Sequence, residues 1–408
     1  MSRKPLILRI LQSSGLVISS ILFSLILLEA ILRISDIGND HFYRFDPVLG
    51  VRFIPSKQGV IRGECFRSEV TINSKGWRDI EHSVNKAEGK FRIMVLGDSF
   101  MAGLQVNDDE TFSRHLEGFF RESDSLPEVD VMNLGVPSFG TDQEYLAFNE
   151  YGRKYKPDMV LLAFYPQNDV ANNYRVIERR NSVYPKPFFD IEDGRLVKLP
   201  FHDETPGWIK LARRISEPFR SYPFIRDRLM GIPAIHNLLF KVGIVGVVPK
   251  EEVVNPPVMD TNYPSRWMRQ VKVYDRQLSD DWKHAWAITK ELILKVRHEV
   301  ELTGAEFVLV EIATPISALP EKSFEKYFKG AGIENLDINK PTNILSAFSE
   351  HNGVNFISLT PVFRNVISGD TNLFSEYYLS CDGHWRSLGH RLAAEAVFSH
   401  IRPLVRQQ

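Results

Sequence analysis

The sequence predicts an α/β protein. We expect a three-layer α/β/α sandwich with a mostly parallel, flavodoxin-like five-stranded sheet, plus an N-terminal transmembrane helix. Short apolar runs alternate with amphipathic stretches, as in chains of βα units, and a long uncharged stretch precedes them. The runs are wholly apolar rather than alternating, which favours strands buried on both faces. The strand candidates are 91–97, 129–133, 158–164, 305–312 and 354–359.

Three amphipathic stretches between and after these runs predict helices. They cover residues 141–155, 278–302 and 388–402 and place apolar side chains at helical spacing. Thr141 is followed three residues later by Glu144, which is the pattern of a capping box at a helix start. Strands that alternate with such helices favour a parallel sheet covered on both faces.

The N-terminus predicts a membrane anchor at residues 1–35. Residues 10–28 carry no charge, and at about 1.5 Å per residue they nearly span a hydrocarbon core of ~30 Å. Arg3, Lys4 and Arg9 precede this run, so the positive-inside bias keeps the N-terminus cytoplasmic. No small-x-small cleavage site follows it, which favours an uncleaved anchor over a signal peptide. We therefore expect a single-pass inner-membrane protein with its catalytic domain periplasmic or extracellular.

The rest of the chain divides by composition. A lead-in segment looks irregular apart from one strand-like piece at 69–73. A Pro-rich and aromatic insertion interrupts the βα rhythm and is expected to be a cap or a substrate-binding region. Within it, residues 238–248 are apolar enough for a membrane surface, but a packed cap is the favoured interpretation. The predicted parts are the lead-in 36–90, the catalytic domain 91–173 with 278–408, and the insertion 174–277.

Charge and cysteine content exclude some classes and leave one question open. Lys and Arg number 50 against 51 Asp and Glu, a net charge of −1, which gives no electrostatic footprint for nucleic acid. Cys65 and Cys381 are the two cysteines. They can form one disulfide in an oxidising compartment, which would tie the lead-in to the loop of Asp382. Of the two alternatives we favour a pair of unrelated buried thiols.

A serine and an Asp–His pair carry the candidate chemistry. Ser99 directly follows the first strand, in Gly-Asp-Ser, at the edge where parallel sheets gather reactive groups. Asp382 and His384 lie two residues apart near the other end of the chain. A serine hydroxyl needs a base to take its proton, and the imidazole needs a carboxylate to fix its tautomer. Taken alone, either motif is more typical of an ordinary loop.

Two middle segments strengthen the prediction. Residues 133–140 follow the second strand and contain Ser138 and Gly140, and Asn168 follows the third strand. They bring backbone amides and a carboxamide to the same predicted edge, where donors to a developing oxyanion would converge. Four such segments in chain order at one edge favour a catalytic site over chance.

In these four segments the chain resembles the SGNH/GDSL hydrolase superfamily, of the membrane-anchored bacterial type. The resemblance covers roughly residues 91–170 and 279–400. It implies Ser99 as nucleophile, His384 as general base and Asp382 as its orienting partner. The implied oxyanion donors are the Ser99 amide, an amide from Ser138 or Gly140, and the Asn168 side chain. His384, His390 and His400 show no i, i+4 pair and no cysteine cluster, so we expect no metal site, and we expect no cofactor.

The chain departs from the family pattern in three places. Ser138 stands where the family commonly has an oxyanion glycine, and Pro166 stands where glycine is usual in the asparagine block. The Asp–His spacing is two rather than three. The segment 73–79, Asn-Ser-Lys-Gly-Trp-Arg-Asp, resembles one that precedes the first strand in anchored members, and structural support is its safest interpretation.

The residues leave several functions open. A serine esterase or deacetylase acting through an acyl-serine on an envelope or extracellular glycan is the leading hypothesis. An O-acetyltransferase on a polysaccharide would use the same triad, and a lipid esterase would suit the anchor. A degenerate domain that only binds polysaccharide is the alternative outside enzymes. The expected partners are an acylated carbohydrate or lipid and the inner membrane.

Overall fold

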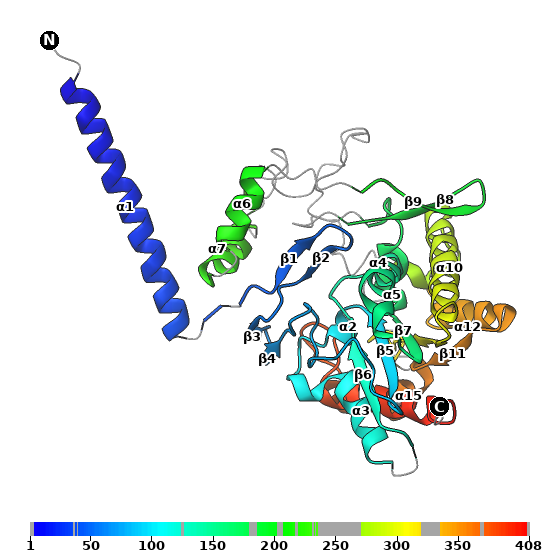
Figure 1. Ribbon diagram of the computed structural model, residues 1–408. Helices are drawn as coiled ribbons and strands as arrows, with labels where there is room; N and C mark the ends of the chain where they lie inside the picture. The colour runs from blue at the N-terminus through cyan, green and yellow to red at the C-terminus, as the bar shows by residue number, and fades with distance from the viewer. Residues whose placement is uncertain are drawn as a thin grey trace.

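The computed structural model has the predicted α/β architecture (Figure 1). It describes residues 4–35, 37–38, 40–123, 126–178, 186–201, 207–216, 219–230, 232, 234–235, 271–319, 335–367 and 371–405. Among them, the core sheet has five strands in the order β11-β10-β7-β5-β6, all pairs parallel. Numbered along the chain, this is the flavodoxin-like order 2-1-3-4-5. The strands are β5 (Phe91–Gly97), β6 (Val129–Asn133), β7 (Met159–Phe164), β10 (Glu306–Glu311) and β11 (Asn355–Ser358).

Alternate residues of these strands pack into separate cores on the two faces of the sheet. Met94 and Leu96 of β5 belong to one core, while Ile93 and Val95 belong to the other. Side chains of a strand point alternately to opposite faces, so a wholly apolar run needs cover on both. The core that contains Met94 and Leu96 is covered by helices that include α4 (Thr141–Ala147), α10 (Asp280–Glu301) and α12 (Lys340–Asn352). The core that contains Ile93 and Val95 is covered by helices that include α3 (Phe112–Arg121), α13 (Thr360–Ile367) and α15 (Ser387–Ile401).

The predicted helix over 141–155 is present, but its predicted capping box is wrong. α4 begins at Thr141 with Gly140 as its N-cap, and a π-helical turn at Phe148–Gly152 continues it. Glu144 is buried, and neither of its carboxylate oxygens has a hydrogen-bond partner in the described part of the chain. Burial and the charges of Asp98 and Asp142 raise its pKa well above the ordinary value. Glu144 therefore points into the protein instead of back to the helix start.

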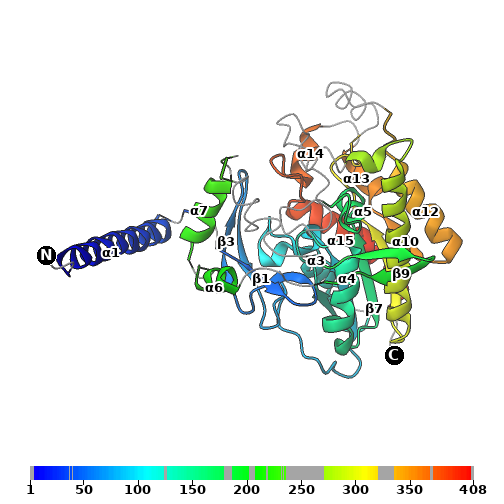
Figure 2. The same cartoon turned by 90° about the horizontal axis from the view of Figure 1, so that it is seen from above.

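The N-terminal helix α1 (Lys4–Ile34) extends away from the body of the protein (Figures 1 and 2). Its segment Gln12–Ile34 has a mean hydropathy of 2.4 and is 6% buried. At about 1.5 Å per residue, these 23 residues are long enough to cross a bilayer core of ~30 Å. By length and composition, α1 is a candidate for a membrane span or a signal sequence.

The described residues of the insertion include the predicted hairpin and the helices α6 (Gly207–Ser216) and α7 (Ser221–Met230). β8 (Phe189–Glu192) and β9 (Arg195–Lys198) pair antiparallel about an Asp-Gly turn, in which both turn residues have positive φ. The hairpin contacts α10, and helices α6 and α7 follow it. The apolar segment 238–248 lies outside the described residues. The domain boundaries remain a prediction.

The lead-in is more regular than expected. It forms two antiparallel hairpins, β1 (Tyr43–Asp46) with β2 (Gly50–Phe53) and β3 (Gln58–Arg62) with β4 (Arg67–Thr71). Their strands have only four or five residues and many half-buried positions. The strand-like piece predicted at 69–73 overlaps β4, but the hydrophobic pattern of the sequence does not reveal the other three strands.

The turn at residues 73–79 joins the lead-in to the core sheet. The Asn73 carboxamide oxygen accepts from the N–H groups of Lys75 and Trp77, both at 3.0 Å. Gly76 has a φ of 81°, and a Cβ there would lie 2.9 Å from the Phe53 carbonyl oxygen. The expected structural role of the motif is confirmed.

A buried histidine extends this junction. His82 Nε2 lies 2.9 Å from Asp79, and its Nδ1 lies 3.6 Å from Asp130 of β6. Burial alone would lower the pKa of His82, but hydrogen bonds and charges of the two carboxylates raise it to about 9. The charged imidazole thus bridges the lead-in and the sheet.

This histidine predicts a loss of stability at alkaline pH. A pKa raised from about 6.5 to about 9 gives stabilisation that is complete below pH 6.5 and lost as pH rises through 9. We expect the free energy of unfolding to fall by up to about 3 kcal/mol across this window. Urea denaturation of the detergent-solubilised chain from pH 6 to 10 measures it. His82→Asn should flatten the profile, and the exposed-site control His351→Asn should not. A wild-type profile already flat would contradict the charged bridge.

Candidate active site

The predicted nucleophile begins a short helix at the carboxyl end of the central strand. β5 ends at Gly97, and α2 (Ser99–Ala102) starts two residues later with Asp98 as its N-cap. The Asp98 carboxylate accepts from the Phe100 N–H at 2.9 Å, which fixes the turn that presents the Ser99 side chain. First-turn N–H groups of a helix lack intrahelical acceptors, so the Ser99 amide is a candidate donor to a substrate oxygen.

Ser99 and His384 meet as predicted. The Ser99 Oγ lies 2.8 Å from His384 Nε2 and 3.4 Å from Asp98 Oδ2. The imidazole is therefore the closer acceptor for the hydroxyl proton. For Nε2 to accept, the ring must carry its proton on Nδ1, which lies 3.3 Å from Asp382 Oδ2. The Nδ1 contact is not aligned as a hydrogen bond, a looseness common in sites without substrate.

A tight loop places Asp382 and His384 together. The Asp382 Oδ1 accepts from the His384 N–H at 3.0 Å, and the loop is closed by Gly383 N–H donating to the Leu379 carbonyl at 2.8 Å. Gly383 has a φ of 77°, and a Cβ there would lie 3.0 Å from Pro315. Glycine between the two residues therefore allows the chain to turn within a spacing of two.

Electrostatics favour an ionised Asp382. Burial raises the pKa of this carboxyl, but hydrogen bonds to His384, the charge of His384 and a hydrogen bond from Gln105 outweigh it and leave the pKa below its ordinary value. Asp98 differs, because complete burial raises its pKa despite hydrogen bonds from Phe100 and Asn168. Of the two carboxyls near the serine, Asp382 is the better stabiliser of a charged imidazole.

The predicted oxyanion residues lie on neighbouring segments. Asn168 belongs to α5 (Pro166–Asn172), and its Nδ2 donates to Asp98 Oδ2 at 3.0 Å, leaving its second N–H for another acceptor. Pro166 occupies the first turn of α5, where a proline costs no hydrogen bond. The structure thus gives a reason for the departure from glycine at this position.

The segment after β6 packs against the same helix. Ser138 has a φ of 68°, in the left-handed region that favours glycine, and its carbonyl oxygen lies 3.4 Å from Asn172 Nδ2. A Cβ at Gly140 would lie 2.7 Å from Asn173 Oδ1, so only glycine fits there. Both remain candidate amide donors to an oxyanion.

Aromatic packing around the histidine was not anticipated from the sequence. The Phe100 ring lies 4.9 Å from the His384 ring, 4.5 Å from Tyr165 and 4.9 Å from Trp385, measured between centroids. Phe100 follows Ser99 in the sequence, and Trp385 follows His384. This adjacency was the only feature of the sequence that could have indicated aromatic packing at the site. The N-cap role of Asp98 was likewise not predicted, although an Asp before a helix start is a typical N-cap.

The two histidines of α15, His390 and His400, lie outside the proposed triad. His390 is buried and packs against Trp385, while His400 is exposed. In the described part of the chain, no group of three or more His, Cys, Asp or Glu side chains is arranged to hold a metal ion.

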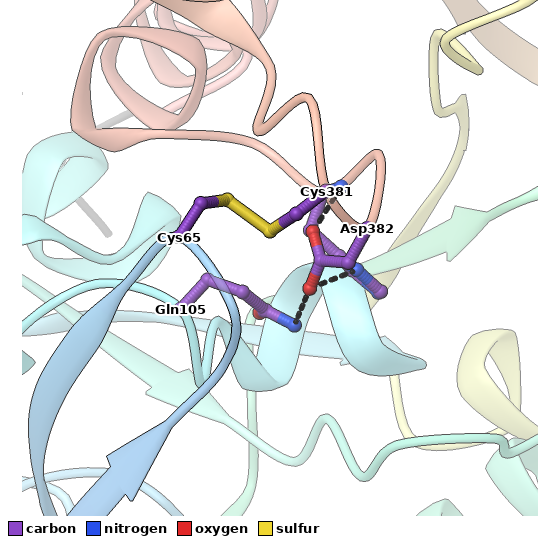
Figure 3. Close-up of a disulfide and its surroundings, with 5 residues drawn as sticks. Cys65, Gln105, Cys381 and Asp382 are labelled. Atoms are coloured by element: carbon purple, nitrogen blue, oxygen red, sulfur yellow. Dashed lines mark hydrogen bonds and ion pairs between the residues drawn. A yellow bond between two sulfur atoms is a disulfide. The ribbon is translucent and has the colours of Figure 1, made fainter.

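The favoured interpretation of the cysteines is wrong. Cys65 and Cys381 form a disulfide with a Cα–Cα distance of 6.0 Å, which lies inside the usual range. The bond joins the turn between β3 and β4 to the residue beside Asp382 (Figure 3). A linear sequence does not show that a lead-in hairpin docks beside a loop 316 residues later.

Comparisons with known proteins give fold neighbours only. No protein-family model matches the sequence, and no curated protein matches it. A lipase/acylhydrolase from Enterococcus faecalis is 11% identical with a TM-score of 0.38, covering 78% of this chain and 98% of that one. The acetyl xylan esterase AlAXEase is 13% identical with a TM-score of 0.38, covering 76% and 100%. A catalytic mutant of an acetylxylan esterase from Geobacillus stearothermophilus is 11% identical with a TM-score of 0.39, covering 78% and 96%. At these values the neighbours do not establish a function for this chain.

Loss of the disulfide should destabilise the protein. Cross-links that close long loops typically contribute ~2–4 kcal/mol, and this one closes a very long loop. We expect Cys65→Ser/Cys381→Ser to lower the urea midpoint of the full chain in detergent. A reducing agent should lower the wild-type midpoint similarly and leave the double variant unchanged. Equal midpoints for both proteins under oxidising conditions would contradict a formed bond.

Proposed function

We propose that this chain is a serine esterase or deacetylase of the SGNH type, with Ser99, His384 and Asp382 as its triad. The observation that carries the proposal is the 2.8 Å contact between Ser99 Oγ and His384 Nε2, with Asp382 at the opposite ring nitrogen. The four motif segments that resemble the SGNH/GDSL superfamily agree with it. Such a constellation is recognised by geometry and roles rather than by its position along the chain.

The reaction would proceed through an acyl-serine. Ser99 Oγ attacks the acyl carbon of the ester while its proton passes to His384 Nε2. The tetrahedral intermediate collapses, the bond to the alcohol oxygen breaks, and the imidazolium returns the proton to that oxygen. Water then attacks the acyl carbon, gives its proton to His384, and displaces Ser99, which is reprotonated as the free acid leaves.

Charge on the carbonyl oxygen needs donors that are already in place. The Ser99 N–H at the start of α2 and the second N–H of Asn168 are the best-supported donors, with the Ser138 or Gly140 amide as the third. Loss of one such donor costs roughly 10²- to 10³-fold in known hydrolases. The hydrogen bond from Asn168 to Asp98 holds the carboxamide in orientation beside the nucleophile.

We propose an acylated carbohydrate of the cell envelope or exterior as substrate. This follows from the proposed anchor: if α1 spans the inner membrane with its basic end inside, Ser99 faces the periplasm or exterior. A disulfide beside Asp382 suits an oxidising compartment. An O-acetyltransferase would use the same residues, with a sugar hydroxyl in place of water. The complete triad argues against a domain that only binds polysaccharide.

Covalent labelling tests the nucleophile. A fluorophosphonate probe should label the full-length protein at Ser99, because its phosphorus accepts an activated serine oxygen as the acyl carbon does. Ser99→Ala should abolish labelling, and His384→Gln should slow it by roughly 10⁴-fold, the size of effect seen when a triad member is lost. Ser83→Ala, at an exposed serine, is the matched control and should label like wild type. Undiminished labelling of Ser99→Ala would end the enzyme proposal.

Reporter fusions test the topology. Alkaline phosphatase fused after residue 60, beyond α1 and inside the lead-in, should be active because that enzyme needs an oxidising compartment. The same reporter fused before α1 should be inactive. The reverse pattern would place Ser99 in the cytoplasm and exclude an envelope glycan as substrate.

A further inference from the structure

The triad carboxylate has a second hydrogen-bond partner that belongs to neither the triad nor the oxyanion site. Gln105 Nε2 donates to Asp382 Oδ2 at 3.1 Å (Figure 3). The same carboxylate oxygen lies 3.3 Å from His384 Nδ1. The other Gln105 atom, Oε1, has no hydrogen-bond partner among the described residues. The opposite orientation of the amide would place Oε1 against a carboxylate oxygen, so electrostatics select the orientation that donates.

The loop that carries Gln105 is held by the lead-in. Arg78 donates from its guanidinium to the carbonyl oxygens of Ala102 at 2.9 Å, Val106 at 2.7 Å and also Gly103. It also forms an ion pair with Asp108 at 3.1 Å. A planar fork with five N–H donors can bind several carbonyls of one loop at once, which a lysine cannot do.

Because Arg78 is buried, breaking its hydrogen bonds to the loop would leave a buried cation with unsatisfied donors. Arg78 is 2% exposed, and burial lowers the pKa of its guanidinium even though Asp108 opposes the shift. A buried cation is tolerated only when its donors are satisfied, and the carbonyls of residues 102–106 supply the acceptors. The loop therefore has one strongly preferred path past the lead-in.

The β4 strand holds the same loop from the side. The Ser68 hydroxyl donates to the Leu104 carbonyl, and the Glu69 N–H donates to Asn107 Oδ1 at 3.2 Å. The carbonyl of Leu104, before Gln105, accepts from Ser68, and the carbonyl of Val106, after Gln105, accepts from Arg78, so the backbone is held on both sides of Gln105. The disulfide of Cys65, on the same hairpin, fixes the residue next to Asp382.

We infer that Gln105 is a positioning residue for Asp382, and that the lead-in segment acts in catalysis by holding Gln105 through Arg78. The inference rests on the proposed function. Gln105 limits the rotation of the carboxylate, and Asp382 in turn keeps the imidazole proton on Nδ1 and the Nε2 lone pair toward Ser99. Without Gln105, contacts with His384 alone would restrain the carboxylate. The carboxylate could then turn away from the imidazole ring more easily.

A double-mutant cycle separates this role from a merely structural one. Gln105→Met removes the donor and keeps the length of a half-buried side chain, so the fold should tolerate it. We expect the rate of fluorophosphonate labelling at Ser99 to fall about tenfold, the value of one hydrogen bond to a charged group. In the Asp382→Asn background the same change should alter the rate less than twofold, because residues that act through one another are not additive. Gln277→Met, at an exposed glutamine, is the matched control in both backgrounds.

Each outcome decides the inference. Equal losses in both backgrounds, or no loss in the native background, would overturn it while leaving the triad intact. A wild-type protein that does not label, or that labels equally after Ser99→Ala, would overturn the proposed function and this inference with it. Melting temperatures of all variants should match wild type within the range of Gln277→Met, and a drop confined to Gln105→Met would assign it a structural role instead.

Discussion

The hydrogen bond between Ser99 and His384 joins two residues that are 285 positions apart. Every other feature of the site contributes to keeping this contact short. The parallel sheet brings the end of β5 to its edge, and Asp98 turns the chain so that Ser99 faces outward. The loop of Asp382 and His384 reaches that edge just before α15, the last helix of the fold. The contact thus depends on long-range packing, and local sequence preference cannot create it.

The lead-in contributes more than a connection between the anchor and the domain. Its turn at 73–79 places Arg78 under the loop after α2 and Asp79 against β6, where Asp79 accepts from the Asn133 N–H at 2.7 Å. Its second hairpin carries the disulfide to Cys381. The helix of Ser99 and the loop of Asp382, which carry two residues of the proposed triad, are therefore both held by one segment that comes before the core in sequence. The boundary predicted at residue 90 follows a change in composition and stays a prediction.

The sequence predicts the sheet well because strands buried on both faces leave continuous apolar runs. β5 and β6 have the predicted bounds, and β7, β10 and β11 lie within the predicted ranges. The triad contact was predictable too, since strand ends in a parallel sheet share one edge. The prediction of a capping box was wrong because the spacing of Thr141 and Glu144 does not show which way the Glu144 side chain turns. In the structure this side chain is buried in the protein and does not turn back to the helix start. Neither the contact of Gln105 with Asp382 nor the disulfide could be predicted from the sequence, because both depend on how the lead-in packs against the core.

We propose that Ser99 is an activated nucleophile that faces prearranged donors, and the structure of its covalent adduct is the decisive test. A crystal structure after fluorophosphonate treatment should show phosphorus bonded to Ser99 Oγ. The phosphoryl oxygen should lie within about 2.7–3.1 Å of the Ser99 amide and Asn168 Nδ2, with His384 Nε2 still beside Oγ. An adduct on another residue, or a phosphoryl oxygen directed away from both donors, would contradict the account.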